Sequence, residues 1–131
     1  MAQFAKARGA KQVLITDVSD FRLEMARKCG IEDTLNVAKT PFKEGIKSVF
    51  GDEGFQAAFE VAGVESSICS LMECIEKGST IVVVAVFDKD PSLSMFYLGE
   101  HELKLNGTMM YRHEDYLAAV DMVSSGAIRL E

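Results

Sequence analysis

Short apolar runs alternate with amphipathic segments along the whole chain. Continuous runs of apolar residues are typical of strands covered on both faces, whereas apolar residues three and four apart indicate helices. The pattern predicts strands at Val13–Thr16, Thr34–Val37, Phe55–Ala62, Thr80–Phe87 and Glu102–Met110. It predicts helices at 2–8, between Ser19 and Gly30, from Thr40 to Phe50, from Glu65 or Ser66 to Gly78, and at His113–Ser125, with one helical turn within Ser94–Glu100.

Residues that favour helix ends lie at the borders of these segments. Gly9 follows the first helix, Ser19 is placed to cap the second, and Thr40-Pro41 provides a hydroxyl followed by a proline at the start of the third. Thr80–Phe87 is the most apolar strand, so we expect it at or near the centre of its sheet.

The order of the elements predicts the fold class. Strands that alternate with helices indicate an α/β protein with a doubly wound, mostly parallel sheet. No internal repeat, low-complexity stretch or linker interrupts the chain, so residues 1–131 are expected to form one domain.

Composition narrows the possible partners. The chain has 131 residues and a net charge of −6 without a cluster of basic residues, which argues against nucleic acid or a membrane surface as a partner. It contains no apolar run long enough to span a bilayer, and its first residues lack a signal core. We therefore expect a cytoplasmic protein. Its cysteines and histidines lack metal-ligand spacing and are expected to serve packing.

The most informative stretch is KQVLITDVSDFR, where a strand ends at Asp17 and a helix carrying Arg22 begins. In a dinucleotide-binding fold, an acid at this strand end accepts hydrogen bonds from the adenosine ribose hydroxyls and repels a 2′-phosphate. The alternative for Asp17 is a cap or turn residue, and the alternative for Arg22 is a solvated helix residue.

Several stretches together resemble the nucleotide-binding domain of the medium-chain, zinc-type alcohol and polyol dehydrogenases, a group that includes the sorbitol, threonine and butanediol dehydrogenases. The resemblance runs nearly end to end and rests on the order and spacing of its motifs. They are AKARGAKQVLITDVSDFRLEMARKCG, FEVAG, EKGSTIVVVAV, ELKLNGTMMY and HEDYLAAVDMVSSGAI.

This resemblance implies a Rossmann-like fold and a set of cofactor-binding residues. It implies that Asp17 binds the ribose and that Arg22 lies along the adenine side. It further implies that the cofactor is lined by Val61 and Ala62, by Val84, Ala85 and Val86, and by Thr108 to Met110. The family usually has glycine where this chain has Ala85. Its polyol branch often carries an arginine near Met110, but the arginine of this chain is Arg112, so we do not assign the family arginine's role to it.

The resemblance also implies that parts of the family's protein are absent. The first strand with its glycine-rich turn would precede Ala2, and the catalytic domain with its zinc would lie elsewhere, so we expect a domain truncated at its N-terminus. Because the first strand is central in the family, the strands Val13–Thr16 and Ala57–Val61 would lose their neighbour. We expect these two strands to move together, or a strand of another chain to fill the gap.

The expected function is the cofactor-binding portion of an NAD-dependent dehydrogenase that transfers a hydride from an alcohol or polyol to NAD. Alone, the chain is expected to be inactive and to bind NAD weakly or not at all. The resemblance further implies a homodimer or higher homo-oligomer through the edge strand Glu102–Met110. The alternative is a stand-alone nucleotide-sensing or interaction module without catalysis; a receiver-like domain is a weaker one, because its clustered acids and lysine are missing.

Overall fold

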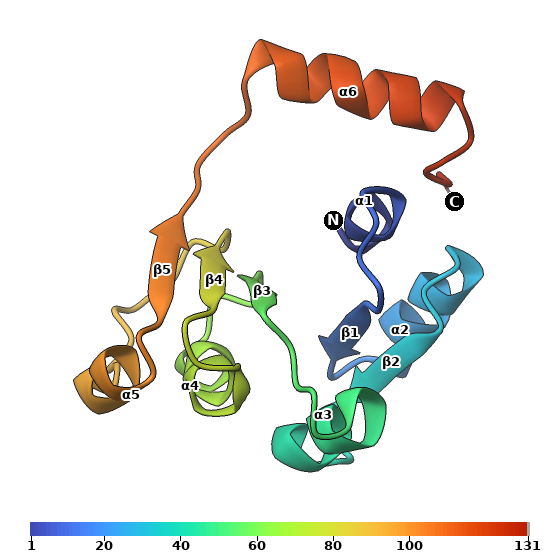
Figure 1. Ribbon diagram of the computed structural model, residues 1–131. Helices are drawn as coiled ribbons and strands as arrows, with labels where there is room; N and C mark the ends of the chain where they lie inside the picture. The colour runs from blue at the N-terminus through green and yellow to red at the C-terminus, as the bar shows by residue number, and fades with distance from the viewer. Residues whose placement is uncertain (131) are drawn as a thin grey trace. The chain divides into compact units, whose positions relative to one another are not determined.

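The computed structural model describes residues 1–130, which fold as two compact units. One unit contains residues 1–45 and the segment that begins at Tyr111, and the other contains Ile46–Met110. The boundary falls within helix α3 (Phe42–Phe50). Figure 1 labels the helices and strands of both units.

The first unit is built on a pair of parallel strands, β1 (Leu14–Asp17) and β2 (Asp33–Asn36). Helix α2 (Asp20–Lys28) connects them and packs against both, with Leu23 only 1% exposed. The register places Asp17 beside Asn36, so the carboxyl ends of both strands lie at one edge. The remaining helices of this unit are α1 (Ala2–Ala7) and α6 (His113–Ser124).

The second unit contains three parallel strands in the order β3 (Ala57–Glu60), β4 (Thr80–Val83) and β5 (Lys104–Gly107) (Figure 1). Helix α4 (Glu65–Cys74) connects β3 with β4, and α5 (Met95–Glu100) lies between β4 and β5 in the chain. Ile81 of β4 is fully buried, which confirms that the most apolar strand occupies the centre of its sheet.

The α/β class, the parallel pairing and the alternation of strands and helices are confirmed, but most strands are shorter than predicted. β4 ends at Val83 rather than Phe87, because the amides of Val84 and Ala85 both donate to the carbonyl of Glu60, at 2.9 and 3.1 Å. This shared acceptor closes the ladder between β3 and β4. Val84, Ala85 and Val86 therefore lie in a loop and not in a strand.

The last strand is also shorter than the predicted Glu102–Met110. Both Glu102 and Met110 have left-handed backbone angles, with φ of 51° and 65°, which an extended strand cannot contain. β5 is therefore confined to Lys104–Gly107, and Thr108 and Met110 follow its end. Similarly, β3 ends at Glu60, so Val61 and Ala62 follow that strand.

One further prediction on β1 needs correction. Leu14 and Ile15 are half-buried, so β1 is less covered than a strand enclosed on both faces. β1 and β3 belong to different units, so the prediction that these two strands move together stays a prediction. A strand from another chain remains a prediction.

Helix ends follow the predicted residues in part. Gly30 has a left-handed φ of 84° directly after the turn that ends α2, as a C-terminal glycine requires. Ser19 occupies the N-cap position of α2, but its side chain makes no capping bond. Instead, the carboxylate of Asp17 accepts a hydrogen bond from the backbone N–H of Ser19. Among the described residues, no helix is long and apolar enough to cross a membrane.

Candidate cofactor site

The predicted ribose acid lies at the carboxyl end of β1, in the turn that leads into α2. Its Oδ1 accepts a hydrogen bond from the backbone N–H of Ser19 at 2.8 Å, and its Oδ2 lies 3.5 Å from Nη1 of Arg22. The side chain of Asp17 is 23% exposed and that of Arg22 is 74% exposed. The structure thus brings together the two residues that the sequence proposed for the adenosine side.

This geometry includes the turn role that was the alternative for Asp17. A carboxylate offers about four lone-pair positions, and the bond to Ser19 occupies one of them. The partly exposed carboxylate can therefore hold the turn and still accept hydrogen bonds from two ligand hydroxyls. Its role toward a ribose stays a prediction.

A second acid at the same edge was missed by the sequence reasoning. Asp20 accepts a hydrogen bond from Nδ2 of Asn36 at 2.7 Å and one from Nζ of Lys39 at 2.5 Å. The bond from Lys39, followed by that from Asn36, lowers the pKa of Asp20 below its ordinary value. The side-chain amide of Asn36 also donates to the backbone carbonyl of Val18 at 3.2 Å. This bond connects the end of β2 with the turn after β1.

In the second unit, the loop after β3 is organised by Glu60, whose side chain is completely buried. Its Oε1 accepts hydrogen bonds from the backbone N–H groups of Ala62 and Gly63 at 3.0 and 3.1 Å, and its Oε2 lies 3.2 Å from the N–H of Gly63. A buried carboxylate is tolerated when such donors satisfy it. The signal in the sequence was an acid inside an apolar run, directly before Val61-Ala62-Gly63.

The loops after β3 and β4 touch each other at Gly63. This residue has a left-handed φ of 69°, and a Cβ there would lie 2.8 Å from the carbonyl oxygen of Val86 and 3.3 Å from Cβ of Ala85. Only glycine therefore permits this approach. The structure brings Val61 and Ala62 into one loop pair with Ala85 and Val86, as the predicted cofactor wall requires.

The residues after β5 continue this edge of the sheet. The N–H of Thr108 donates to the carbonyl of Val83 at 3.0 Å, which holds the start of the loop beside the end of β4. Met110 closes the loop with its left-handed backbone and is 76% exposed, and Val86 is 75% exposed. The predicted residues of this unit thus follow the carboxyl ends of three adjacent parallel strands, where open α/β sheets bind ligands.

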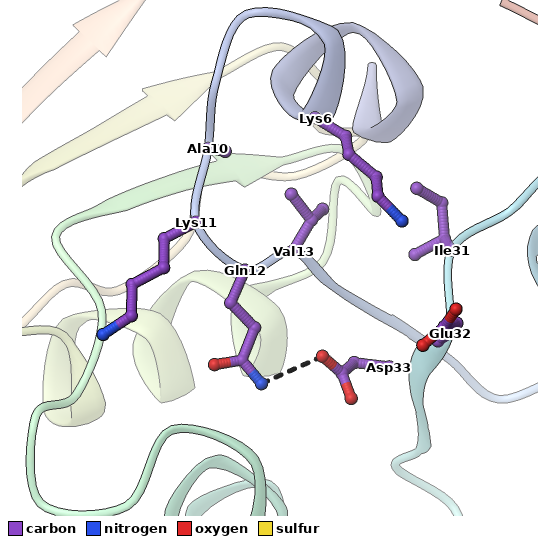
Figure 2. A pocket seen from close by; sticks show the side chains of 8 residues that line it. All are labelled: Lys6, Ala10, Lys11, Gln12, Val13, Ile31, Glu32 and Asp33. Carbon is purple, nitrogen blue, oxygen red and sulfur yellow. Dashed lines mark hydrogen bonds between the residues drawn. The ribbon is translucent and has the colours of Figure 1, made fainter.

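Figure 2 shows a pocket at the opposite edge of the β1–β2 pair. Its lining comes from the segment before β1 and from the start of β2, where Nε2 of Gln12 donates to Oδ2 of Asp33 at 2.9 Å. The lining residues are Lys6, Ala10, Lys11, Gln12, Val13, Ile31, Glu32 and Asp33. Because this pocket lies at the amino ends of the strands, it is distinct from the predicted ribose site.

Metal chemistry finds no support in this part of the protein. Across residues 1–130, no three side chains of His, Cys, Asp or Glu gather in a way that could hold a metal ion. The three cysteines, Cys29, Cys69 and Cys74, form no disulfide and are partly buried. Burial, followed by the charge of Glu65, raises the pKa of the Cys69 thiol, which makes its thiolate less available as a ligand. The described residues therefore do not fit zinc.

The fold and the strand-end loops together define a class of protein. Residues 1–125 match the family described as zinc-binding dehydrogenase, and the chain belongs to this family. It is related to the NAD(P)-binding domain of the zinc-dependent alcohol and polyol dehydrogenases. The family resemblance inferred from the sequence is thereby confirmed.

Particular relatives place the chain more closely. It is 33% identical to an L-threonine 3-dehydrogenase of Marinomonas sp. over 128 residues, which cover 95% of this chain and 37% of the relative. A short chain alcohol dehydrogenase of Escherichia coli CFT073, complexed with NADH, superposes with a TM-score of 0.85 at 20% identity, covering 98% of this chain and 37% of that one. A zinc-binding dehydrogenase of Sinorhizobium meliloti, bound to NADP, gives a TM-score of 0.86 at 22% identity, covering 98% and 39%.

The chain corresponds to only part of each of these relatives. The chain spans little more than a third of the length of the threonine dehydrogenase that it matches. The two solved structures carry different nicotinamide cofactors, so the fold alone does not choose between NAD and NADP.

Proposed function

We propose that this chain forms the adenosine and nicotinamide walls of the cofactor site in an NAD-dependent, zinc-type alcohol or polyol dehydrogenase. In the whole enzyme, zinc would polarise the substrate oxygen during hydride transfer. The described residues would hold the cofactor and would not hold the metal. Residues 1–131 would act as one NAD-binding domain that is inactive without the parts that carry the zinc and the substrate pocket.

The observation that supports this proposal best is the carboxylate of Asp17 at the carboxyl end of β1. It is partly exposed, keeps free acceptor positions and faces Arg22. A negative charge here favours two ribose hydroxyls over a 2′-phosphate, which supports NAD as the cofactor. Val61, Ala62, Val84, Ala85, Val86, Thr108 and Met110 would form the rest of the wall.

Asp17→Asn tests this role without removing the turn. The asparagine oxygen can still accept from the N–H of Ser19, whereas the charge that repels a 2′-phosphate is lost. Titration calorimetry of the full chain should show weak NAD binding and weaker NADP binding. The variant should reduce the preference for NAD by about tenfold, as expected for the loss of one charge-assisted hydrogen bond.

Asp33→Asn is a matched control, because Asp33 begins β2 at the opposite edge of the same strand pair. It should leave the preference unchanged. An unchanged preference in Asp17→Asn would mean that Asp17 serves only the turn. Micromolar NAD binding by the isolated chain would instead favour a working nucleotide sensor without catalysis.

A further inference from the structure

We propose that Asp20 sets the cofactor preference at the carboxyl end of β1 by neutralising Lys39, a cation that would otherwise be available to a 2′-phosphate. This inference deepens the proposed function and rests on it. According to this inference, the choice between NAD and NADP depends on the pair Asp20 and Lys39 as well as on Asp17 at the end of β1.

The register of the two strands brings this pair to the ribose edge. Asp17 of β1 lies directly beside Asn36 of β2. The side-chain amide of Asn36 reaches across to Oδ1 of Asp20, and Lys39, three residues further on, donates to Oδ2 of the same carboxylate. Asp20 thus connects the turn that carries the predicted ribose acid with the turn that carries the lysine.

The charges at this edge are balanced in two pairs. Arg22 lies 3.5 Å from Asp17, and Lys39 lies 2.5 Å from Asp20. A ribose with two hydroxyls adds no charge to this arrangement, whereas a 2′-phosphate adds close to two negative charges and requires a cation that is not already paired. The shorter pair is that of Lys39, so Lys39 is the cation that its acid neutralises more closely.

The pair is exposed, and it persists at neutral pH. The side chains of Lys39 and Asp20 are 65% and 66% exposed, so an incoming ligand can reach them. An aspartate carboxylate is charged at neutral pH, and the hydrogen bond from Lys39 moves the pKa of Asp20 further below that range. The competition between Asp20 and a phosphate for the same ammonium group therefore operates wherever the protein is folded at neutral pH.

Asp20→Asn separates the charge from the structure. An asparagine oxygen can still accept from Asn36, so the link between the two turns is retained while the charge opposite Lys39 disappears. Binding of 5′-AMP and 2′,5′-ADP to the full chain can be followed by the backbone amide shifts of residues 16–22 in nuclear magnetic resonance spectra. These two ligands differ in the 2′-phosphate and lack the nicotinamide half.

We expect Asp20→Asn to raise the affinity ratio of 2′,5′-ADP to 5′-AMP about fivefold at low ionic strength, the size of an exposed ion-pair effect. The double variant Asp20→Asn with Lys39→Met should return the ratio to that of the unmodified chain. Glu24→Gln is the matched control, because it removes the same charge and releases Arg27, 3.0 Å away, on the same helix. It should leave the ratio unchanged.

The possible failures are distinguishable. If 5′-AMP shifts none of the amides at the β1 end of the unmodified chain, this inference is overturned, whereas the proposed function of the whole enzyme is not, because the chain alone is expected to bind the cofactor weakly or not at all. If 5′-AMP binds there but Asp20→Asn leaves the ratio unchanged, only this inference is overturned. An equal rise in Glu24→Gln, or a rise that survives Lys39→Met, would also overturn it, since the effect would then be one of net charge.

Discussion

At the scale of single residues, Gly63 shows how closely the loops at the cofactor edge of the second unit approach each other. Its left-handed φ is one reason for glycine, and the carbonyl oxygen of Val86 is the other. Gly51 shares the first reason only: its φ is 63°, and a Cβ there would meet nothing within 4 Å. Substituting each glycine therefore distinguishes the cost of backbone strain, which both share, from the cost of crowding, which only Gly63 has.

We expect Gly63→Ala to lower the free energy of unfolding by about 2–5 kcal/mol and Gly51→Ala by about 1–2 kcal/mol. A left-handed alanine costs roughly 1–2 kcal/mol, and crowding of a packed site adds about 1–3 kcal/mol. Urea unfolding of both variants measures the difference. Equal losses would show that the loop of Val86 moves aside without cost.

The residues at the site differ in how far the sequence could reveal them. Asp17 and Arg22 were predictable because they lie in one strand-turn-helix segment, where local spacing determines what can meet. The link between Asp20 and Lys39 depends on the register of β1 against β2, which the sequence does not state. The role of Glu60 was not predicted, because its apolar neighbours indicate only a strand. Its carboxylate instead accepts hydrogen bonds from the backbone N–H groups of Ala62 and Gly63.

At the scale of elements, the strand ends carry most of the difference between prediction and structure. Hydrophobic patterns mark where apolar residues continue, but a strand ends where its partner no longer supplies hydrogen bonds. Thr80–Phe87 remains apolar to its end, yet the carbonyl of Glu60 captures the amides of Val84 and Ala85 and stops the ladder. For this reason the predicted cofactor residues Val84, Ala85 and Val86 lie in a loop.

β5 is an edge strand whose two sides can be told apart. The amides of Lys104 and Thr108 donate to Ser79 and Val83 beside β4, so by alternation that of Asn106 points the same way and those of Leu105 and Gly107 point to the free edge. We propose that this free edge pairs with a second copy of the chain. The dimer expected through Glu102–Met110 would use Leu105 and Gly107.

Proline substitutions test the dimer on the correct side of the strand. Gly107→Pro removes an outward N–H and should weaken dimerisation measured by sedimentation, with little change in unfolding free energy. Asn106→Pro removes an inward N–H and should destabilise the sheet itself by about 1–3 kcal/mol. If Gly107→Pro leaves the association constant unchanged, β5 does not form the interface.

At the scale of the whole molecule, the described strands form two small sheets, and each sheet has edge strands. In a two-stranded pair both strands are edges, and in the three-stranded sheet β3 and β5 are. Edge strands present unpaired backbone groups and favour association with other chains, and a charged residue on the edge opposes it. β5 carries Lys104, whereas the β3 edge carries Phe59, which is 48% exposed.

We expect Phe59→Lys to reduce concentration-dependent association of the chain in sedimentation velocity, because it places a charge on the unprotected edge. Val120→Lys is the control: Val120 is 45% exposed and lies on helix α6, not on a strand. A similar reduction in both variants would indicate general exposure of apolar surface, and no reduction in Phe59→Lys would show that β3 is not the associating edge.

The order of the elements was predictable at this scale, and the family followed from it together with the motifs. Each helix and strand is a local pattern, and parallel strands joined by helices leave few topologies.

The buried carboxylate of Glu60 also has a consequence for motion. Loops commonly fluctuate on the nanosecond to microsecond timescale, independently of the strands that they follow. The loop Val61–Gly63 is closed by an acid that belongs to the core, so the loop cannot open without leaving that charge unsatisfied in an apolar interior. Its opening is therefore tied to disruption of β3 itself, a slower and rarer event. The loop, which is predicted to line the cofactor, thus shares the rigidity of the sheet that carries it.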